Sequence, residues 1–175
     1  MPGGTRVDRE CNEYFRVHRE LKPGEVFTST AGDMPFQKVI HTVGPIWSSN
    51  NYGSHDREDH ELKLAVEAAL NESEKLGFRR VAIPAISCGI YGFPIDRASP
   101  IILNSIISFL KNSRQVEEVS LVAKIEHIKI FHEELSTRLP RTKRASSVDT
   151  SGRLLLSYTR NYLNNCLFNM KHVII

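Results

Sequence analysis

The spacing of apolar residues in the first part of the chain predicts one helix followed by two strands. Residues 6–20 combine charged side chains with apolar ones at helical spacing, which is typical of an amphipathic helix. The apolar positions that carry this pattern are Val7, Cys11, Tyr14 and Phe15. Residues 25–30 and 38–43 are rich in β-branched and aromatic residues and are separated by turn-forming residues, so both are predicted to be strands.

The same reading predicts three more helices and two more strands before residue 140. Apolar residues at helical spacing predict helices over residues 62–76, 98–110 and 128–139, and short apolar runs predict strands over 80–86 and 119–123. Gly77 directly follows the first of these helices, where glycine commonly ends a helix in the left-handed conformation. This alternation predicts an α/β layered fold with a mixed or parallel sheet.

The regular pattern stops at Pro140, which divides the chain into a domain, residues 1–139, and a tail, residues 140–175. The tail holds six Lys and Arg against one Asp, so the domain keeps 17 basic and 19 acidic residues. We expect the basic tail to be disordered, with an extra element docked on the domain as the alternative. The basic stretch 141–144 is interpreted as a solvated linker, the alternative being a nuclear address or nucleic-acid patch.

Composition narrows the class of protein. With 41% hydrophobic and 25% charged residues, the 175-residue chain is typical of globular proteins. The sequence shows neither a secretory signal nor an apolar run of transmembrane length, so we expect a location in the cytoplasm or nucleus and no membrane partner. The three cysteines are expected to be reduced thiols, and neither a metal nor a cofactor is expected. An acidic domain without interleaved aromatic and basic residues argues against nucleic-acid binding.

A loop with two glycines carries the candidate chemistry. It follows the predicted strand 80–86, ends at Pro94 where the next helix begins, and contains Ser87, Cys88, Gly89, Ile90, Tyr91 and Gly92. Ligands of α/β sheets bind beyond the carboxyl ends of strands, where unpaired N–H groups at the next helix attract anions. Gly89 and Gly92 permit φ > 0 and let a ligand approach the backbone closely. The pattern therefore predicts a diphosphate-binding loop.

Two side chains of this loop, and two on or just after the earlier strand 38–43, invite further assignments. The ring of Tyr91 is expected either beside a bound sugar or packed half-buried on the domain, and spacing does not favour one over the other. Cys88 lacks a neighbouring base in sequence, which favours a small buried residue over a nucleophile. His41 lies on a β-branched run and is interpreted as a packed residue rather than a general base, and Trp47 as packing.

Two segments resemble known sequence motifs of macro domains. Residues 81–94 resemble the second ligand loop of that family, and residues 39–47 resemble one of its strands. In layout, residues 1–139 are similar to macro domains attached to poly-ADP-ribose polymerase relatives and to those of ADP-ribosyl hydrolases. The resemblance implies a three-layer α/β/α fold with a mixed sheet. It also implies that the diphosphate and distal ribose of ADP-ribose contact Ser87, Cys88, Gly89, Ile90, Tyr91 and Gly92.

The sequence departs from the family pattern near its start. Macro domains open with two strands and an Asn-Ala-Ala-Asn-like segment before a glycine-rich first loop, and the expectation here is a truncated domain lacking those first strands. The adenine-recognising Asp, the hydrolytic Asn and the first-loop acid are then missing, and no catalytic residue is assigned. We expect a module that binds ADP-ribose or mono-ADP-ribosylated protein. The alternatives are a mono-ADP-ribosyl hydrolase or O-acetyl-ADP-ribose deacetylase, and an inactive fragment of a larger macro-domain protein.

Overall fold

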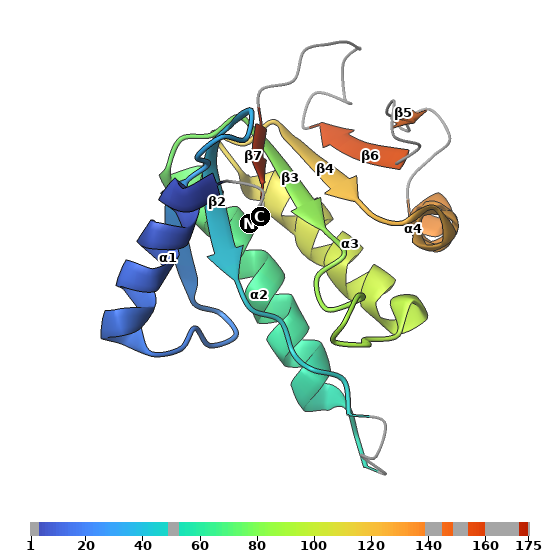
Figure 1. Ribbon diagram of the computed structural model, residues 1–175. Coiled ribbons are helices and arrows are strands. Elements are labelled where there is room, and N and C mark those ends of the chain that lie inside the picture. Colours follow the sequence, from blue (N-terminus) through green and yellow to red (C-terminus); the bar gives the residue numbers. More distant parts are fainter. Residues whose placement is uncertain (1–3, 49–52, 139–144, 149–153, 160–171, 175) are drawn as a thin grey trace.

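Up to residue 138, the helices and strands follow one another in the order that the sequence predicts (Figure 1). The computed structural model describes residues 4–48, 53–138, 145–148, 154–159 and 172–174. Up to residue 138 its elements are α1 (Gly4–His18), β1 (Val26–Thr30), β2 (Phe36–Thr42), α2 (Asp56–Lys75), β3 (Arg80–Pro84), α3 (Ile95–Asn112), β4 (Glu118–Val122) and α4 (Ile125–Arg138). Each predicted helix and strand in this range is present, with ends shifted by at most three residues except for α2, which begins six residues before the predicted start.

Three further strands follow in the described residues, β5 (Ala145–Val148), β6 (Leu154–Thr159) and β7 (His172–Ile174). With them the described strands form one seven-stranded mixed sheet in the order β1-β2-β7-β3-β4-β6-β5. Strands β1 and β2 form an antiparallel hairpin in which Phe27 faces His41. Strands β3 and β4 run parallel, with Val81 opposite Val119, because helix α3 provides the long crossover that a parallel pair requires. The predicted α/β fold with a mixed sheet is therefore confirmed.

Part of the segment 140–175, for which the sequence favours disorder, forms three strands of this sheet. They are β5, β6 and β7. Strand β6 pairs antiparallel with β4, and β7 lies between β2 and β3, parallel to both (Figure 1). Such short strands depend on partner strands for their hydrogen bonds, so local periodicity gives little sign of them. For residues 140–144, 149–153, 160–171 and 175, the expected disorder lies outside the described residues.

Helices cover both faces of the sheet, which gives the three layers that the resemblance implies. Neighbouring residues of a strand point to opposite faces. On β2, the buried Ile40 packs with Ala69 of α2, whereas the next residue, His41, lies 3.8 Å from the sulfur of Cys11 in α1. Helices α2 and α1 therefore lie on opposite sides of the β1–β2 hairpin.

The main core lies where α2, α3 and α4 pack against β3 and β4. Its fully buried members are aliphatic or aromatic side chains from all five elements, among them Leu62, Leu70, Ile83, Ile102, Leu103, Ile106, Leu121 and Phe131. Gly77, with φ +73°, reverses the chain after α2, as predicted. None of the helices in the described part of the chain is both long enough and apolar enough to cross a bilayer.

Candidate functional site

The glycine-containing loop lies between the carboxyl end of β3 and the amino end of α3. Pro94 precedes the first residue of the 18-residue helix, with φ −60° and ψ 127°, and its carbonyl accepts the first helical hydrogen bonds from Arg97 and Ala98. The first N–H groups of a helix lack partners within the helix, and the helix dipole places partial positive charge there. This end of α3 therefore attracts anions.

Hydrogen bonds within the loop fold its backbone into two tight turns. The N–H donors are those of Cys88, Gly92 and Phe93, and they reach the carbonyls of Ala85, Gly89 and Ser87 at 3.1, 3.0 and 3.0 Å, respectively. Hydrogen bonds within its own main chain therefore help to fix the conformation of the loop.

Three successive amides of this loop are not used in these bonds. The N–H groups of Gly89, Ile90 and Tyr91 donate to no acceptor in the part of the chain that the structure describes. Unpaired polar groups are satisfied by water or by ligands, and successive amides of a turn form concave sites for anions. The loop thus offers the donors that a phosphate group requires.

The two glycines serve the loop in different ways, which corrects one expectation. Only Gly92 has a positive φ, +68°; the other left-handed residue of the loop is Ser87, with φ +64°. Gly89 has no positive φ, but a Cβ built on it would meet nothing within 4 Å. The first reversal after β3 falls on Ser87, so Gly89 needs no special conformation and instead leaves open space beside the three unpaired amides.

The loop presents two large side chains to solvent. Ile90 is fully exposed, and Tyr91 is 38% exposed. Tyr91 thus lies at the surface next to the amides, and contact between its ring and a sugar stays a prediction.

Cys88 lacks the properties of a nucleophile. Burial raises the pKa of its thiol to about 12, and the Sγ donates to the carbonyl of Ile86 at 3.5 Å. The thiolate is the reactive form of cysteine, so this side chain stays protonated and unreactive at neutral pH. The structure places Cys88 in a partly buried position against the main core, so it is less buried than the sequence interpretation had it.

His41 lies away from the loop, between α1 and the β1–β2 hairpin. Its Nε2 is 2.8 Å from the Oγ of Ser29, and its ring stacks on Phe27 with centroids 5.2 Å apart. Burial lowers the pKa of its imidazole, so the ring is neutral at physiological pH. These contacts fit the prediction of a packed residue.

Residues 43–47, the strand extension that follows β2, pack against the loop and donate a hydrogen bond to it, a role that the sequence did not reveal. A Cβ on Gly44 would lie 2.3 Å from the Oγ of Ser87 and 2.6 Å from Cγ2 of Ile86. Three residues later, the N–H of Trp47 donates to the carbonyl of Tyr91 at 2.8 Å. The only sequence signal for this contact is a glycine–proline pair directly after an apolar strand, which is common in loops of every kind.

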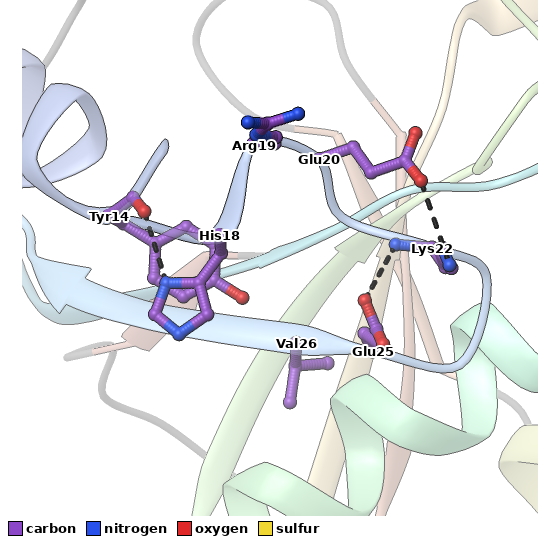
Figure 2. A pocket seen from close by; sticks show the side chains of 7 residues that line it. All are labelled: Tyr14, His18, Arg19, Glu20, Lys22, Glu25 and Val26. Atoms are coloured by element: carbon purple, nitrogen blue, oxygen red, sulfur yellow. Dashed lines mark hydrogen bonds and ion pairs between the residues drawn. The ribbon is translucent and has the colours of Figure 1, made fainter. Parts of the chain in front are cut away.

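A separate hollow of about 680 Å³ opens at the carboxyl end of α1 (Figure 2). It is lined by Tyr14, His18, Arg19, Glu20, Lys22, Glu25 and Val26. Several of its polar groups bind one another: Lys22 Nζ lies 3.7 Å from Glu20, and the Lys22 N–H donates to Glu25 at 2.9 Å. The carboxyl end of a helix carries partial negative charge, so this hollow suits a diphosphate less well than the loop does.

Neither the loop 87–92 nor the hollow at the end of α1 is marked by a cluster of metal-ligating side chains. Within the described ranges, no three His, Cys, Asp or Glu side chains come together as a set of metal ligands.

Comparison with known proteins connects this geometry to a family. The family model of the Macro domain matches residues 2–102. The O-acetyl-ADP-ribose deacetylase 1 of Pantoea vagans is 39% identical over 120 residues, covering 69% of this chain and 68% of that protein. The human protein mono-ADP-ribosyltransferase PARP14 is 35% identical over 122 residues, a match that covers 68% of this chain and 7% of that longer protein.

Solved structures give the same relationship. A macrodomain of Oceanobacillus iheyensis with ADPR superposes with a TM-score of 0.71 at 29% sequence identity, covering 78% of this chain and 73% of that one. The resemblance seen in segments 39–47 and 81–94 is thereby confirmed. Because the family model matches more than half of the chain, this protein belongs to the macro-domain family.

Proposed function

We propose that the chain binds ADP-ribose, free or attached to a protein, through the loop 87–92. The single observation that carries this proposal is the row of three unpaired amides at Gly89, Ile90 and Tyr91, just before the amino end of α3. A diphosphate offers several negatively charged oxygens, and such oxygens form strong hydrogen bonds with main-chain N–H groups. The row of amides holds the diphosphate, and the exposed ring of Tyr91 contacts the adjoining ribose.

Related proteins support this choice of anion. The Oceanobacillus iheyensis macrodomain is described with ADPR, and the Pantoea vagans relative takes its name from O-acetyl-ADP-ribose. Both compounds, ADPR and O-acetyl-ADP-ribose, contain a diphosphate that links two riboses. The shared fold and a loop suited to a diphosphate make ADP-ribose the ligand that best fits this chain.

A second candidate is hydrolysis of O-acetyl-ADP-ribose, favoured by the 39% identity to a deacetylase. In this reaction water attacks the acetyl carbonyl, the ester bond to the ribose breaks, and acetate and ADP-ribose are released. Burial raises the pKa of the Cys88 thiol to about 12, which makes it a poor nucleophile and favours water as the attacking group. The loop contributes by fixing the diphosphate, so that the ester is held in one orientation toward water.

Titration calorimetry of the full chain with ADP-ribose tests the binding proposal. Gly89→Glu places a carboxylate beside the three amides, and because its Cβ meets nothing within 4 Å, the variant is expected to fold normally. We expect a loss of affinity of at least ~30-fold, which corresponds to roughly 2 kcal/mol. Gly89→Gln is the matched control of similar size without charge, and its loss is expected to be several-fold smaller.

An assay of the unmodified chain and the Gly89→Glu variant distinguishes binding from hydrolysis. Incubation of the chain with O-acetyl-ADP-ribose, followed by measurement of released acetate, detects the second activity. Acetate release that disappears in Gly89→Glu supports the deacetylase, whereas ADP-ribose binding without acetate release supports a binding module. A folded chain that shows no heat with ADP-ribose contradicts both functions.

A further inference from the structure

The indole of Trp47 lies in a stack of side chains at the base of the loop. Its ring is stacked on His55, with centroids 3.9 Å apart and an interplanar angle of 23°. It also meets the ring of Phe93 at 4.9 Å and 59°, and the guanidinium carbon of Arg97 lies 5.8 Å from its centroid. Stacking and cation–π contacts of this kind favour a single orientation of an aromatic ring.

The partners of the indole are themselves fixed to two helix ends. Arg97, in the first turn of α3, donates from Nε and Nη2 to the two carboxylate oxygens of Asp59, in the first turn of α2, at 2.7 and 2.9 Å. Such bidentate pairs have a defined geometry as well as a favourable energy. His55 immediately precedes α2. The stack therefore joins the amino ends of α2 and α3 to the segment that follows β2.

A main-chain hydrogen bond connects this stack to the candidate ligand loop. The N–H of Trp47 donates to the carbonyl of Tyr91 at 2.8 Å, and Tyr91 is the last of the three residues with unpaired amides. Two residues after Tyr91, Phe93 contacts the indole directly. The loop is therefore held at two points, Tyr91 and Phe93, by one residue from a distant part of the sequence.

We infer that Trp47 is a positioning residue for the loop 87–92. The stack of His55, Phe93 and Arg97 fixes the indole, and the Trp47 main chain then holds the Tyr91 carbonyl, so that the three amides keep one arrangement before a ligand arrives. A preorganised site spends less free energy on ordering when it binds. The identity of the ligand in this inference rests on the proposed function. The positioning role of Trp47 itself can be measured in the ligand-free chain.

The binding experiment compares three variants of the full chain. Trp47→Ala removes the ring and is expected to weaken ADP-ribose binding about tenfold, whereas Trp47→Phe retains an aromatic ring and is expected to recover most of the affinity. Leu135→Ala is the control for general destabilisation, because Leu135 is a buried core residue of α4. It is expected to lower the melting temperature and to leave the affinity of the folded protein unchanged.

Hydrogen exchange of the ligand-free chain tests the positioning role by itself. The amides of Cys88, Gly92 and Phe93 are hydrogen-bonded within the loop, so their exchange reports how often the loop opens. We expect faster exchange at these three amides in Trp47→Ala than in Leu135→Ala, with Trp47→Phe close to the unmodified chain. Equal loop exchange in the unmodified chain and Trp47→Ala would overturn the inference, whatever the ligand proves to be.

Fluorescence supplies a third measurement, because Trp47 is the single tryptophan of the chain. Ligand contact with the loop is expected to change its emission, with the same dissociation constant as calorimetry gives. If the chain binds ADP-ribose while Trp47→Ala keeps full affinity, the positioning role is wrong and the proposed function stands. If the unmodified chain does not bind ADP-ribose, the proposed function is wrong, and loop exchange alone decides the role of Trp47.

Discussion

Two short stretches of main chain, the turn 113–116 and the loop 89–91, each present successive N–H groups. In the described part of the chain, a side chain of the protein accepts hydrogen bonds from these N–H groups only in the turn. In the turn 113–116, the carboxylate of Glu74 accepts hydrogen bonds from the N–H groups of Arg114, Gln115 and Val116 and from the hydroxyl of Ser113, at 2.7 to 3.2 Å. In the loop, the N–H groups of residues 89–91 donate to no acceptor within the described part of the chain. The difference suggests where a foreign anion binds.

Glu74 shows how strongly such a row of donors stabilises a negative charge. Burial raises the pKa of its carboxyl group, but the hydrogen bonds from Ser113 and from the three amides together outweigh it and lower the pKa to about 2. A carboxyl group therefore remains ionised here far below its usual range. The loop offers three comparable amides together with a helix amino end, so a diphosphate is expected to gain stabilisation of the same kind.

The largest effect is expected from Gly44→Ala, which disturbs the loop from below and leaves the turn 113–116 untouched. The new Cβ would overlap the Oγ of Ser87 and Cγ2 of Ile86, so the loop or the strand extension must shift. Overpacking of this kind costs about 3 kcal/mol of unfolding free energy at a rigid site. Urea denaturation measures the loss, and calorimetry should show weaker ADP-ribose binding.

Gly89→Ala is the matched control for that substitution. It adds the same methyl group to a glycine with open space and without a positive φ, so the free energy of unfolding should change by less than about 0.5 kcal/mol. Equal stability losses in the two alanine variants would contradict the close packing of Gly44 against Ser87 and Ile86.

A smaller effect is expected from Glu74→Gln, which removes the internal anion. Hydrogen bonds to a charged group contribute more than neutral ones, so the variant should lose about 2 kcal/mol at pH 7. Because the pKa is lowered in the folded state, this contribution is fully present above the ordinary value of 4.5 and disappears as the pH falls toward 2. Urea denaturation across this pH range should show the two proteins converging in acid, while ADP-ribose affinity at neutral pH stays unchanged.

The smallest effect is expected in the hollow at the end of α1. Arg19 adopts φ +60°, a conformation that glycine reaches without strain. Arg19→Gly should therefore raise the free energy of unfolding by up to about 1 kcal/mol, as measured by thermal denaturation. Its ADP-ribose affinity should stay within twofold of the unmodified chain; a larger loss would place the ligand in this hollow instead of the loop.

Sequence patterns predicted the parts of this molecule that depend on local periodicity. The helix with Leu62 lies where spacing placed it because it buries a repeating set of side chains, and the strand at Val81 was visible as an apolar run whose consecutive residues are all buried. The contact of Gly44 with Ser87, and the bond between Trp47 and Tyr91, join residues more than forty positions apart. Such contacts depend on how the strands are ordered in the sheet, which periodicity does not encode.

The candidate site could be predicted only in part, again because sequence patterns report local structure and not contacts between distant residues. The order of strand, glycine loop and helix is local, so residues 87–92 could be proposed as a unit. Which of the loop residues adopts the left-handed conformation depends on the neighbouring strand extension, and Ser87 takes that conformation while packed against Gly44. The three strands after residue 144 were hidden because they are defined by their partner strands: β6 pairs with β4 and β5, and β7 joins β2 to β3.

Titration of the ¹⁵N-labelled chain with ADP-ribose, followed by NMR of its amide groups, tests the central claim most directly. A new hydrogen bond to a phosphate oxygen should move the proton resonances of Gly89, Ile90 and Tyr91 downfield. The amides of residues 114–116, already bonded to Glu74, should remain where they are. Saturable binding that leaves the three loop amides unmoved, or that moves residues at the end of α1 instead, would contradict the account.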